Sequence, residues 1–226
     1  MKCHYAIIAI IKHKGTHSLD IIEVIVNGIE PSAYFLKKHP YWRPINSGIC
    51  FNVFEDSETH HIFKVQSLRC GSEQIKEIKY WSQYCIDNQH IQYLPTFNSC
   101  IVYQFDRKKL FCIDCEKLID IEPYPELVAD VKSIFYGYIA KAFIDLTDDD
   151  IDLIMDRIQQ SHYFSKRVDT DFESFFRTLL KDLRKIARQQ GDTIFSLDFH
   201  FRNFMIRPNT GQLVIVDAFS CSMYNE

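Results

Sequence analysis

Glycine is scarce in this chain, and flexible or repetitive segments are missing. Seven glycines occur among 226 residues, and the sequence contains no repeats, low-complexity tracts or Gly/Ser-rich linkers. Such a chain is not a repeat array or a string of loosely tethered modules. Its length is enough to bury a sizeable core, as one domain or as two lobes around a cleft.

Long apolar runs are also absent. No run approaches the roughly 18–20 residues that a membrane helix needs. The short apolar stretch Tyr5–Ile11 is followed by no small-residue cleavage site. We therefore read it as a buried element, and not as a signal peptide. We expect no membrane partner and a cytoplasmic location.

Charge of one sign does not dominate. The net charge is -4, with 25% charged and 46% hydrophobic residues. These values are ordinary for a soluble globular protein. They give no reason to expect nucleic acid as the main partner.

The eight cysteines lack a framework spacing and are most simply reduced thiols. Cys112 and Cys115 in "CIDC" form the one suggestive pair. A redox motif would need a strand-to-helix turn, and a zinc site would need a second pair. His60 and His61 could supply nitrogen ligands, but nothing in the sequence places them near the pair. Buried strand positions are the preferred interpretation.

The first half of the chain combines helix and strand patterns. Two helices are expected in a helical extension over residues 1–44, around "SLDIIEVIVNGI" and "PSAYFLKKH". Residues 45–122 then read as a β-rich lobe containing one helix. "GICFNVFEDSETHHIFKVQSL" predicts two strands joined by a polar turn, and "SCIVYQF" and "KLFCIDC" predict two more. Between these pairs, "GSEQIKEIKYWSQYCIDN" has helical spacing.

Residues 123–226 are predicted to form a helical lobe. Two prolines in "IEPYPE" mark the joint. Three segments then place apolar residues three and four apart: "ELVADVKSIFYGYIAKAFIDL", "TDDDIDLIMDRIQQSHYF" and "DTDFESFFRTLLKDLRKIARQQG". We interpret the acidic run after Thr147 as a helix start in preference to a metal site. The expected fold is therefore α+β and two-lobed, with a cleft between the lobes.

Polar residues interrupt the apolar segment "SLDFHFRNFMIRPNTGQLVIVDAF". Asp198 and Asn203 stand five apart, and Asp217 follows fourteen residues later, at the end of an apolar strand. Between them "RPNTGQ" predicts a hairpin turn, in which Gly211 can take a positive φ. Folded back, the hairpin would bring Asp217 beside Asn203. An Asp after a helix is often only a cap, and D-x-H-x-x-N alone arises by chance. The combination of D-x4-N, a turn and an apolar strand that ends in Asp, just after a long helix, favours a catalytic or metal-binding role.

Two carboxylates and an amide around one point offer the hard oxygen ligands that Mg²⁺ prefers. A separate carboxylate can orient an attacking hydroxyl and accept its proton. The β-rich half should then supply a cation for phosphates. Lys64, inside the apolar strand "IFKV", is the candidate, although it could instead be a solvent-facing residue. Glu73 and Glu77 could both pair with it, and Glu77 projects closer to the apolar stripe of its helix. Gly48 is a lone glycine before the first strand.

With these residues in place, the sequence resembles the protein-kinase-like superfamily, and in particular the early protein kinases of small podoviral phages. "IFKV" is similar to their "IKV"-type strand end, and "SLDFHFRN…DA" to their "SFDMHxGN…DP". The resemblance covers roughly residues 45–222 and implies the cofactors ATP and Mg²⁺. It implies that Lys64 orients the α- and β-phosphates, that Glu77 braces Lys64, and that Gly48 belongs to a reduced glycine-rich loop.

For the second lobe, the resemblance implies that Asp198 is the catalytic base and that Asn203 and Asp217 hold Mg²⁺. Several positions depart from the usual pattern of protein kinases. Ser196 replaces a histidine, His200 a lysine, and Asp-Phe-Gly becomes Asp217-Ala218-Phe219. Arg202 replaces the glycine that precedes the metal-binding Asn in the phage kinases and in small-molecule phosphotransferases. Phosphotransferases of the aminoglycoside and choline type share the histidine at position 200.

The chain stops nine residues after Asp217, so we expect a fold truncated after the metal-binding Asp, without an activation segment. The expected function is transfer of the ATP γ-phosphoryl group to a hydroxyl, by a serine/threonine protein kinase acting on a protein substrate. Two alternatives stay open. One is a small-molecule kinase acting on an alcohol, and the other is a pseudokinase that acts as a binding module.

Overall fold

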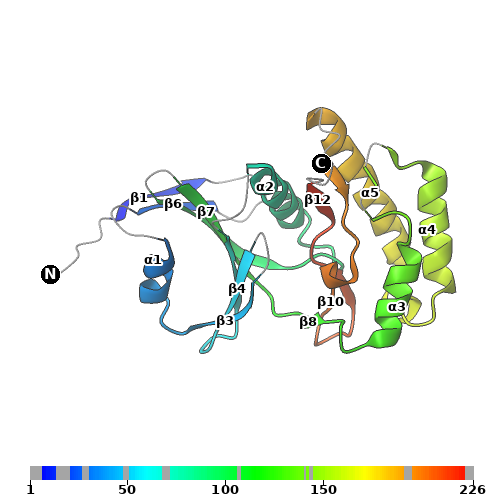
Figure 1. Cartoon of the computed structure of the whole chain (residues 1–226), viewed down its shortest axis with the longest axis horizontal. Helices are drawn as coiled ribbons and strands as arrows, with labels where there is room; N and C mark the ends of the chain where they lie inside the picture. The colour runs from blue at the N-terminus through cyan, green and yellow to red at the C-terminus, as the bar shows by residue number, and fades with distance from the viewer. Residues whose placement is uncertain are drawn as a thin grey trace. The chain divides into compact units, whose positions relative to one another are not determined.

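The computed structural model describes residues 7–13, 21–26, 31–47, 51–67, 72–105, 108–139, 141–142, 145–190 and 195–221. The fold is α+β, as expected (Figure 1). Its contacts divide the chain into two compact units. The first comprises residues 1–75, 83–89 and 96–117, and the second comprises residues 76–82, 90–95 and 118–226.

A seven-stranded sheet forms the first unit, in the order β1-β2-β6-β7-β5-β4-β3. Neighbouring strands are antiparallel, except that β2 and β6 are parallel. The strands are β1 (Ile7–His13), β2 (Ile21–Val26), β3 (Trp42–Ser47), β4 (Phe51–Asp56), β5 (Ile62–Gln66), β6 (Phe97–Phe105) and β7 (Lys108–Cys115).

Helix α1 (Pro31–Lys38) packs its aromatic residues against this sheet. Tyr34 and Phe35 are buried with Tyr103 and Phe105 of β6, and the ring centroids of Phe35 and Tyr103 lie 5.0 Å apart. Trp42 stacks on Phe35 and joins the same core. Edge-to-face and stacked pairs of this kind add to the free energy of burying the rings. The helix expected at "PSAYFLKKH" is confirmed.

Of the two helices expected within residues 1–44, the first is wrong. Residues 21–26, placed in a helix from "SLDIIEVIVNGI", form strand β2 instead. The segment Ile21–Val26 has five β-branched residues out of six, which suit a pleated strand. Pairing with β6 then satisfies its backbone groups within the sheet.

The four strands expected within residues 49–115 are confirmed as β4, β5, β6 and β7. The β4–β5 turn is closed by Asp56, whose Oδ1 accepts hydrogen bonds from the amides of Glu58 and Thr59. His60 takes a positive φ of 59° at the end of this turn. The expected helix between the strand pairs is α2 (Ser72–Asp87).

The second unit combines helices with two small sheets (Figure 1). Strands β8, β10 and β11 form one sheet, and β9 pairs with β12 in the other. The elements are β8 (Ile119–Asp120), α3 (Pro125–Ile134), α4 (Asp148–Gln160), η2 (Ser165–Arg167), α5 (Asp171–Gln190), β9 (Phe195–Leu197), η3 (Phe201–Asn203), β10 (Phe204–Ile206), β11 (Leu213–Ile215) and β12 (Phe219–Cys221).

Helix α3 is shorter than its apolar spacing predicts: it ends at Ile134, whereas the spacing predicts an end near residue 146. Arg157 from α4 donates through Nη1 to the carbonyl oxygens of Ser133, Ile134 and Tyr136. These bonds satisfy carbonyls that a longer helix would have used itself. Gly137 follows with a φ of +83°, which turns the chain away from the helix.

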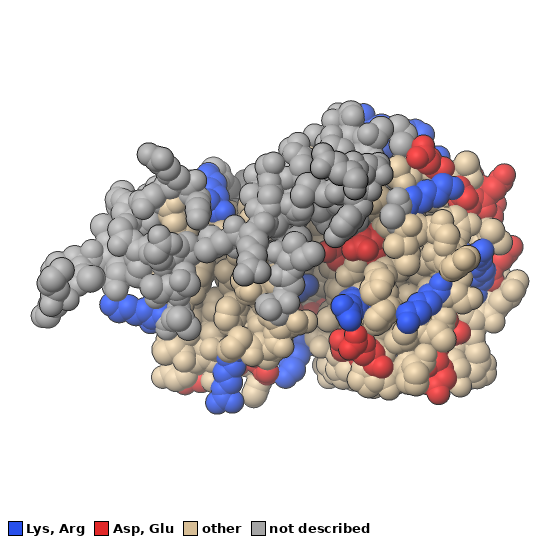
Figure 2. Space-filling model, viewed as in Figure 1, with Lys and Arg blue, Asp and Glu red and all other residues tan. Residues whose placement is uncertain are grey.

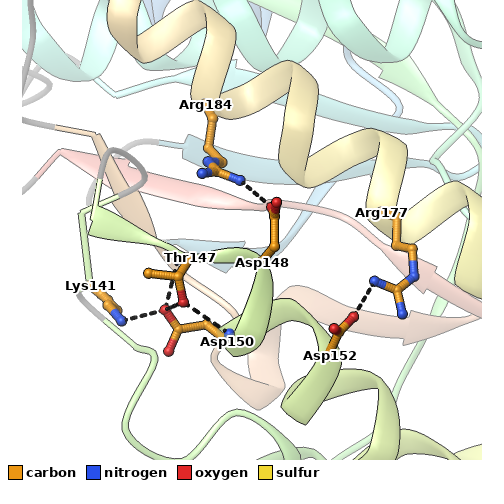
Figure 3. Close-up of polar contacts among 7 residues, drawn as sticks. All are labelled: Lys141, Thr147, Asp148, Asp150, Asp152, Arg177 and Arg184. Atoms are coloured by element: carbon orange, nitrogen blue, oxygen red, sulfur yellow. Dashed lines mark hydrogen bonds and ion pairs between the residues drawn. The ribbon is translucent and has the colours of Figure 1, made fainter.

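The acidic run Asp148–Asp150 forms the first turn of α4, so it is a helix start as predicted (Figure 3). The Thr147 side chain accepts from the Asp150 amide at 3.1 Å, and Asp150 Oδ2 accepts from the Thr147 amide at 2.8 Å. This reciprocal pair is a capping box. Lys141 also donates to Asp150 Oδ2, at 2.8 Å.

The core of the second unit is rich in phenylalanine. Phe135 lies at ring-centroid distances of 4.8 Å from Phe199, 5.3 Å from Phe204 and 6.0 Å from Phe176. All four side chains are fully buried. This cluster joins α3 and α5 to the segment that follows β9.

Two surface properties bear on the expected partners. No helix within the described ranges is long and apolar enough to cross a membrane. On the face drawn in Figure 2, basic and acidic side chains of the described residues are interspersed.

Candidate functional site

The candidate site is built on the loop that follows β9. Leu197 of β9 pairs with Phe219 of β12, and the Asp198 amide then donates to the Ala218 carbonyl at 3.1 Å. Leu197 and Ala218 are completely buried, whereas Asp198 is half-buried. The strand pair therefore places the Asp198 backbone next to Ala218, the residue that follows Asp217.

Asn203 bonds directly to Asp198. Its Nδ2 donates to the Asp198 backbone carbonyl at 2.7 Å and to carboxylate Oδ2 at 2.9 Å. The five-residue spacing noted in the sequence thus closes a tight loop. Because Nδ2 is the donor in both bonds, the amide oxygen of Asn203 faces away from Asp198, and it accepts no hydrogen bond from the described residues.

The hairpin brings Asp217 back to Asn203, as predicted. Gly211 in the turn has a φ of +71°, and Arg167 Nη1 donates to its carbonyl at 3.0 Å. The Val216 amide donates to the Asn203 carbonyl at 2.9 Å. The expected strand ends at Ile215, two residues earlier than predicted, so Asp217 lies in the link between β11 and β12. Its side chain is half-buried.

Two residues that the sequence did not single out for the site hold this link in place. Trp81 of α2 donates from Nε1 to the Val216 carbonyl at 2.8 Å. The Ile215 amide donates to the Tyr93 carbonyl at 2.9 Å. Trp81 had only the signal of an apolar helix stripe, and a hydrogen bond across 135 positions leaves no local pattern.

Phe199 anchors the loop by packing into the buried aromatic core. It stands between Asp198 and His200, is 1% exposed, and contacts Phe135, Phe176 and Phe204. Its neighbours in the chain are half-buried. One buried ring thus fixes the backbone from which both polar side chains extend.

The oxygens of Asp198, Asn203 and Asp217 form a hard donor set that fits Mg²⁺. The described residues contain no group of three or more His, Cys, Asp or Glu side chains that could hold a metal. A metal at this loop would therefore need the Asn203 amide oxygen together with carboxylates. It would also need water or substrate oxygens to complete its shell.

Lys64 lies in the first unit, on β5, between β4 and β7. Its register partners are Val53 and Ile113, and its side chain is half-buried. The side chains of Glu73 and Glu77 lie outside the described residues, as does Gly48. The predicted brace and glycine-rich loop therefore stay predictions.

The positions that depart from the kinase pattern have distinct surroundings. Ser196 is 2% exposed and forms a β-bridge with Ala142. His200 accepts from the Arg202 amide through Nδ1 at 3.4 Å. Arg202 is 70% exposed and pairs with Glu122 at 3.3 Å. Arg202 is thus a largely exposed side chain that pairs with Glu122.

Cys112 and Cys115 are buried strand residues, the preferred interpretation of "CIDC". Burial raises the pKa of both thiols, that of Cys115 to about 11. His61 is engaged with Asp114, whose Oδ2 lies 3.2 Å from Nδ1. Neutral, buried thiols of this kind are poor nucleophiles and poor metal ligands.

The chain matches no protein-family model, and no curated protein matches it.

Proposed function

We propose that this protein transfers the γ-phosphoryl group of ATP to a hydroxyl group, as a serine/threonine protein kinase. One observation carries the proposal: Asp198, Asn203 and Asp217 are joined through the hydrogen bonds of Asn203 and Val216 on two strand pairs. A cap or a buried core segment would not need this combination of half-buried oxygen ligands.

In the proposed reaction, Asp198 orients the acceptor hydroxyl and takes its proton. The hydroxyl oxygen forms a bond to the γ-phosphorus, the bond from that phosphorus to the bridging oxygen breaks, and ADP leaves. The Asn203 bond to Oδ2 fixes one carboxylate oxygen of Asp198 and leaves the other for the hydroxyl. The loop thus supplies orientation as well as a base.

Mg²⁺ would be held by Asn203 and Asp217, and when bound it would neutralise charge on the phosphates. Lys64 is proposed to contact the α- and β-phosphates, with Glu77 as its brace and Gly48 in the loop that covers them. These three assignments depend on the resemblance and on the strand context of Lys64.

The main experiment compares Asp198→Asn with the wild-type protein in a radiolabelled ATP assay. We expect the variant to lose phosphoryl transfer and to keep Mg·ATP affinity, measured by calorimetry. The matched control is Asp156→Asn, because Asp156 is exposed on α4 and makes no hydrogen bond or ion pair with the described residues. Unchanged labelling in Asp198→Asn would contradict the assignment.

Lys64→Gln provides a second arm. It should weaken Mg·ATP binding and transfer, whereas Lys109→Gln, at an exposed position of β7, should change neither. Equal ATP affinity in wild type and Lys64→Gln would remove Lys64 from the proposal.

Offering cell lysate and metabolite pools separately as acceptors tests the substrate class. Labelling of proteins supports a protein kinase. Labelling confined to small alcohols would favour the aminoglycoside/choline-type alternative. ATP binding without any transfer would favour a pseudokinase.

A further inference from the structure

The second half of α5 carries four cations on one face. Lys181, Arg184, Lys185 and Arg188 are spaced at positions i, i+3, i+4 and i+7, which share a face of a helix. Together with Asp148 at the start of α4, they line a hollow of about 460 Å³. The helical spacing places the four cations on one face, and the start of α4 borders the same hollow.

The charge in the hollow is largely uncompensated. Arg184 pairs with Asp148, with Nη1 and Oδ1 3.0 Å apart. Lys181, Lys185 and Arg188 are exposed and form no hydrogen bond or ion pair with other described residues. Among the described lining residues, four cations against one carboxylate leave an excess of three positive charges, although the whole chain has a net charge of -4.

Arg177, two turns before Arg184 on α5, is by contrast paired with acidic side chains (Figure 3). It pairs with Asp152 at 2.6 Å and with Glu173 at 2.9 Å, and these carboxylates raise its pKa. The first half of the helix is therefore neutralised by neighbouring acids. The helix dipole favours cations only in the last turn, which accounts for Arg188 but not for Lys181.

Arg184 is held in the hollow with spare hydrogen-bonding capacity. Its side chain is 18% exposed, and Asp148 engages only Nη1 among the described residues. Its Nε is buried and has no partner in the described part of the chain. A buried donor without an acceptor is unfavourable. Oxygen atoms brought by a ligand would supply acceptors for the rest of the guanidinium group.

The geometry points to an acidic peptide segment, rich in Asp and Glu, as the ligand of this hollow. Seven residues of helix rise about 10 Å, so the cations extend over about 10 Å. An extended peptide places side chains of one face about 7 Å apart, so two acidic side chains match this length. A single phosphate ion would meet only part of the row.

A protein partner fits this surface better than single-stranded nucleic acid. Sites for single strands combine cations with aromatic platforms for the bases. None of the described residues that line the hollow is aromatic. The inference goes beyond the proposed phosphotransfer and does not depend on it.

Fluorescence anisotropy on the full chain tests the inference. The probes are a labelled peptide of consecutive Glu and Asp residues, its Gln and Asn counterpart, and labelled oligothymidylate. We expect binding of the acidic peptide, with affinity that falls as salt rises. The Gln and Asn peptide should not bind.

Variants locate the site. Lys181→Gln, Lys185→Gln and Arg188→Gln should each weaken acidic-peptide binding about two- to fourfold, and the triple variant about tenfold or more. Arg177→Gln is the matched control, since it removes a cation from the same helix outside the hollow, and it should bind as the wild type does. Circular dichroism of each variant checks the fold, which exposed side chains should leave unchanged.

Several results would overturn the inference. These are absence of acidic-peptide binding to the wild type, full affinity in the triple variant, or equal loss in Arg177→Gln. Tighter binding of oligothymidylate would assign the hollow to nucleic acid. Displacement of the peptide by inorganic phosphate at equal concentration would make it a single-anion site.

Discussion

The side-chain amide of Asn203 donates to both the backbone carbonyl and the carboxylate of Asp198, at 2.7 and 2.9 Å. One residue thereby sets the loop conformation and the orientation of the proposed base together. The same residue accepts a backbone bond from Val216, which leads directly to Asp217. Asn203 is therefore the centre of the site as well as a candidate ligand.

Asn203→Ala should destabilise the protein by about 1–2 kcal/mol, because it removes two hydrogen bonds, one of them to a carboxylate. Denaturant unfolding measures this change, and the phosphotransfer assay should show a loss of transfer. Asn88→Ala is the comparison, since Asn88 Nδ2 makes a single bond to the Tyr84 carbonyl at 2.9 Å. It should cost less, about 0.5–1 kcal/mol. A larger effect in Asn88→Ala than in Asn203→Ala would contradict this account.

Phe199→Ala should lower the free energy of unfolding by about 3–5 kcal/mol, because it leaves a cavity among packed aromatic rings. Denaturant unfolding again provides the measurement. Tyr136→Ala removes a ring that is 79% exposed and should change stability by less than about 0.5 kcal/mol. Similar stabilities for the two variants would show that Phe199 does not anchor the loop.

Asp150 should contribute to acid sensitivity. Hydrogen bonds from Lys141 and Thr147 lower its pKa to about 2, below the ordinary value of 3.8. A carboxylate with a depressed pKa stabilises the fold above its unfolded pKa, and this contribution is lost as the pH falls from about 4 to about 2. Because solvent screens the partly exposed pair, we expect about 1 kcal/mol.

Asp150→Asn should therefore flatten the pH dependence of the unfolding free energy between pH 4 and pH 2. The neighbouring Asp149→Asn makes the same charge change at the same helix end, and Asp149 has no hydrogen bond to the described residues. Its profile should stay parallel to that of the wild type over this range. Identical slopes in all three proteins would contradict the prediction.

Tyr93 should produce the opposite dependence at alkaline pH. Burial, and then the hydrogen bond that its hydroxyl donates to Asp169, raise the pKa of Tyr93 from 10.0 to about 12. The neutral phenol is favoured in the folded state, so this contribution is complete below pH 10 and is lost as the pH rises towards 12.

Tyr93→Phe should accordingly have a flatter stability profile between pH 10 and pH 12, measured by unfolding at each pH. It should also be less stable at neutral pH by about 1–2 kcal/mol, because Asp169 loses a donor. Tyr163→Phe, at a position 44% exposed, is the control. An unchanged alkaline slope in Tyr93→Phe would exclude this role.

Local sequence patterns predict an element correctly where the element's own residues decide its conformation. The β4–β5 hairpin combines alternating apolar residues with an Asp-closed turn, and α4 starts at a capping box. Patterns failed where a distant partner decides. Apolar spacing predicts a helix over residues 21–26, but pairing with β6 makes this segment strand β2. Helix α3 ends early where Arg157 binds its carbonyls.

By itself, the sequence determined the α+β class, most element types, and the spacing that unites Asp198, Asn203 and Asp217. These depend on periodicity, caps and turn residues, which act over a few positions. Only the tertiary structure decided which groups hold that site: the Trp81 side chain, the Tyr93 carbonyl and the ring of Phe199. It also decided that the cations of α5 line a hollow while Arg177 is neutralised. Hydrogen bonds, packing and charge compensation join residues far apart in the chain, so no local pattern contains them.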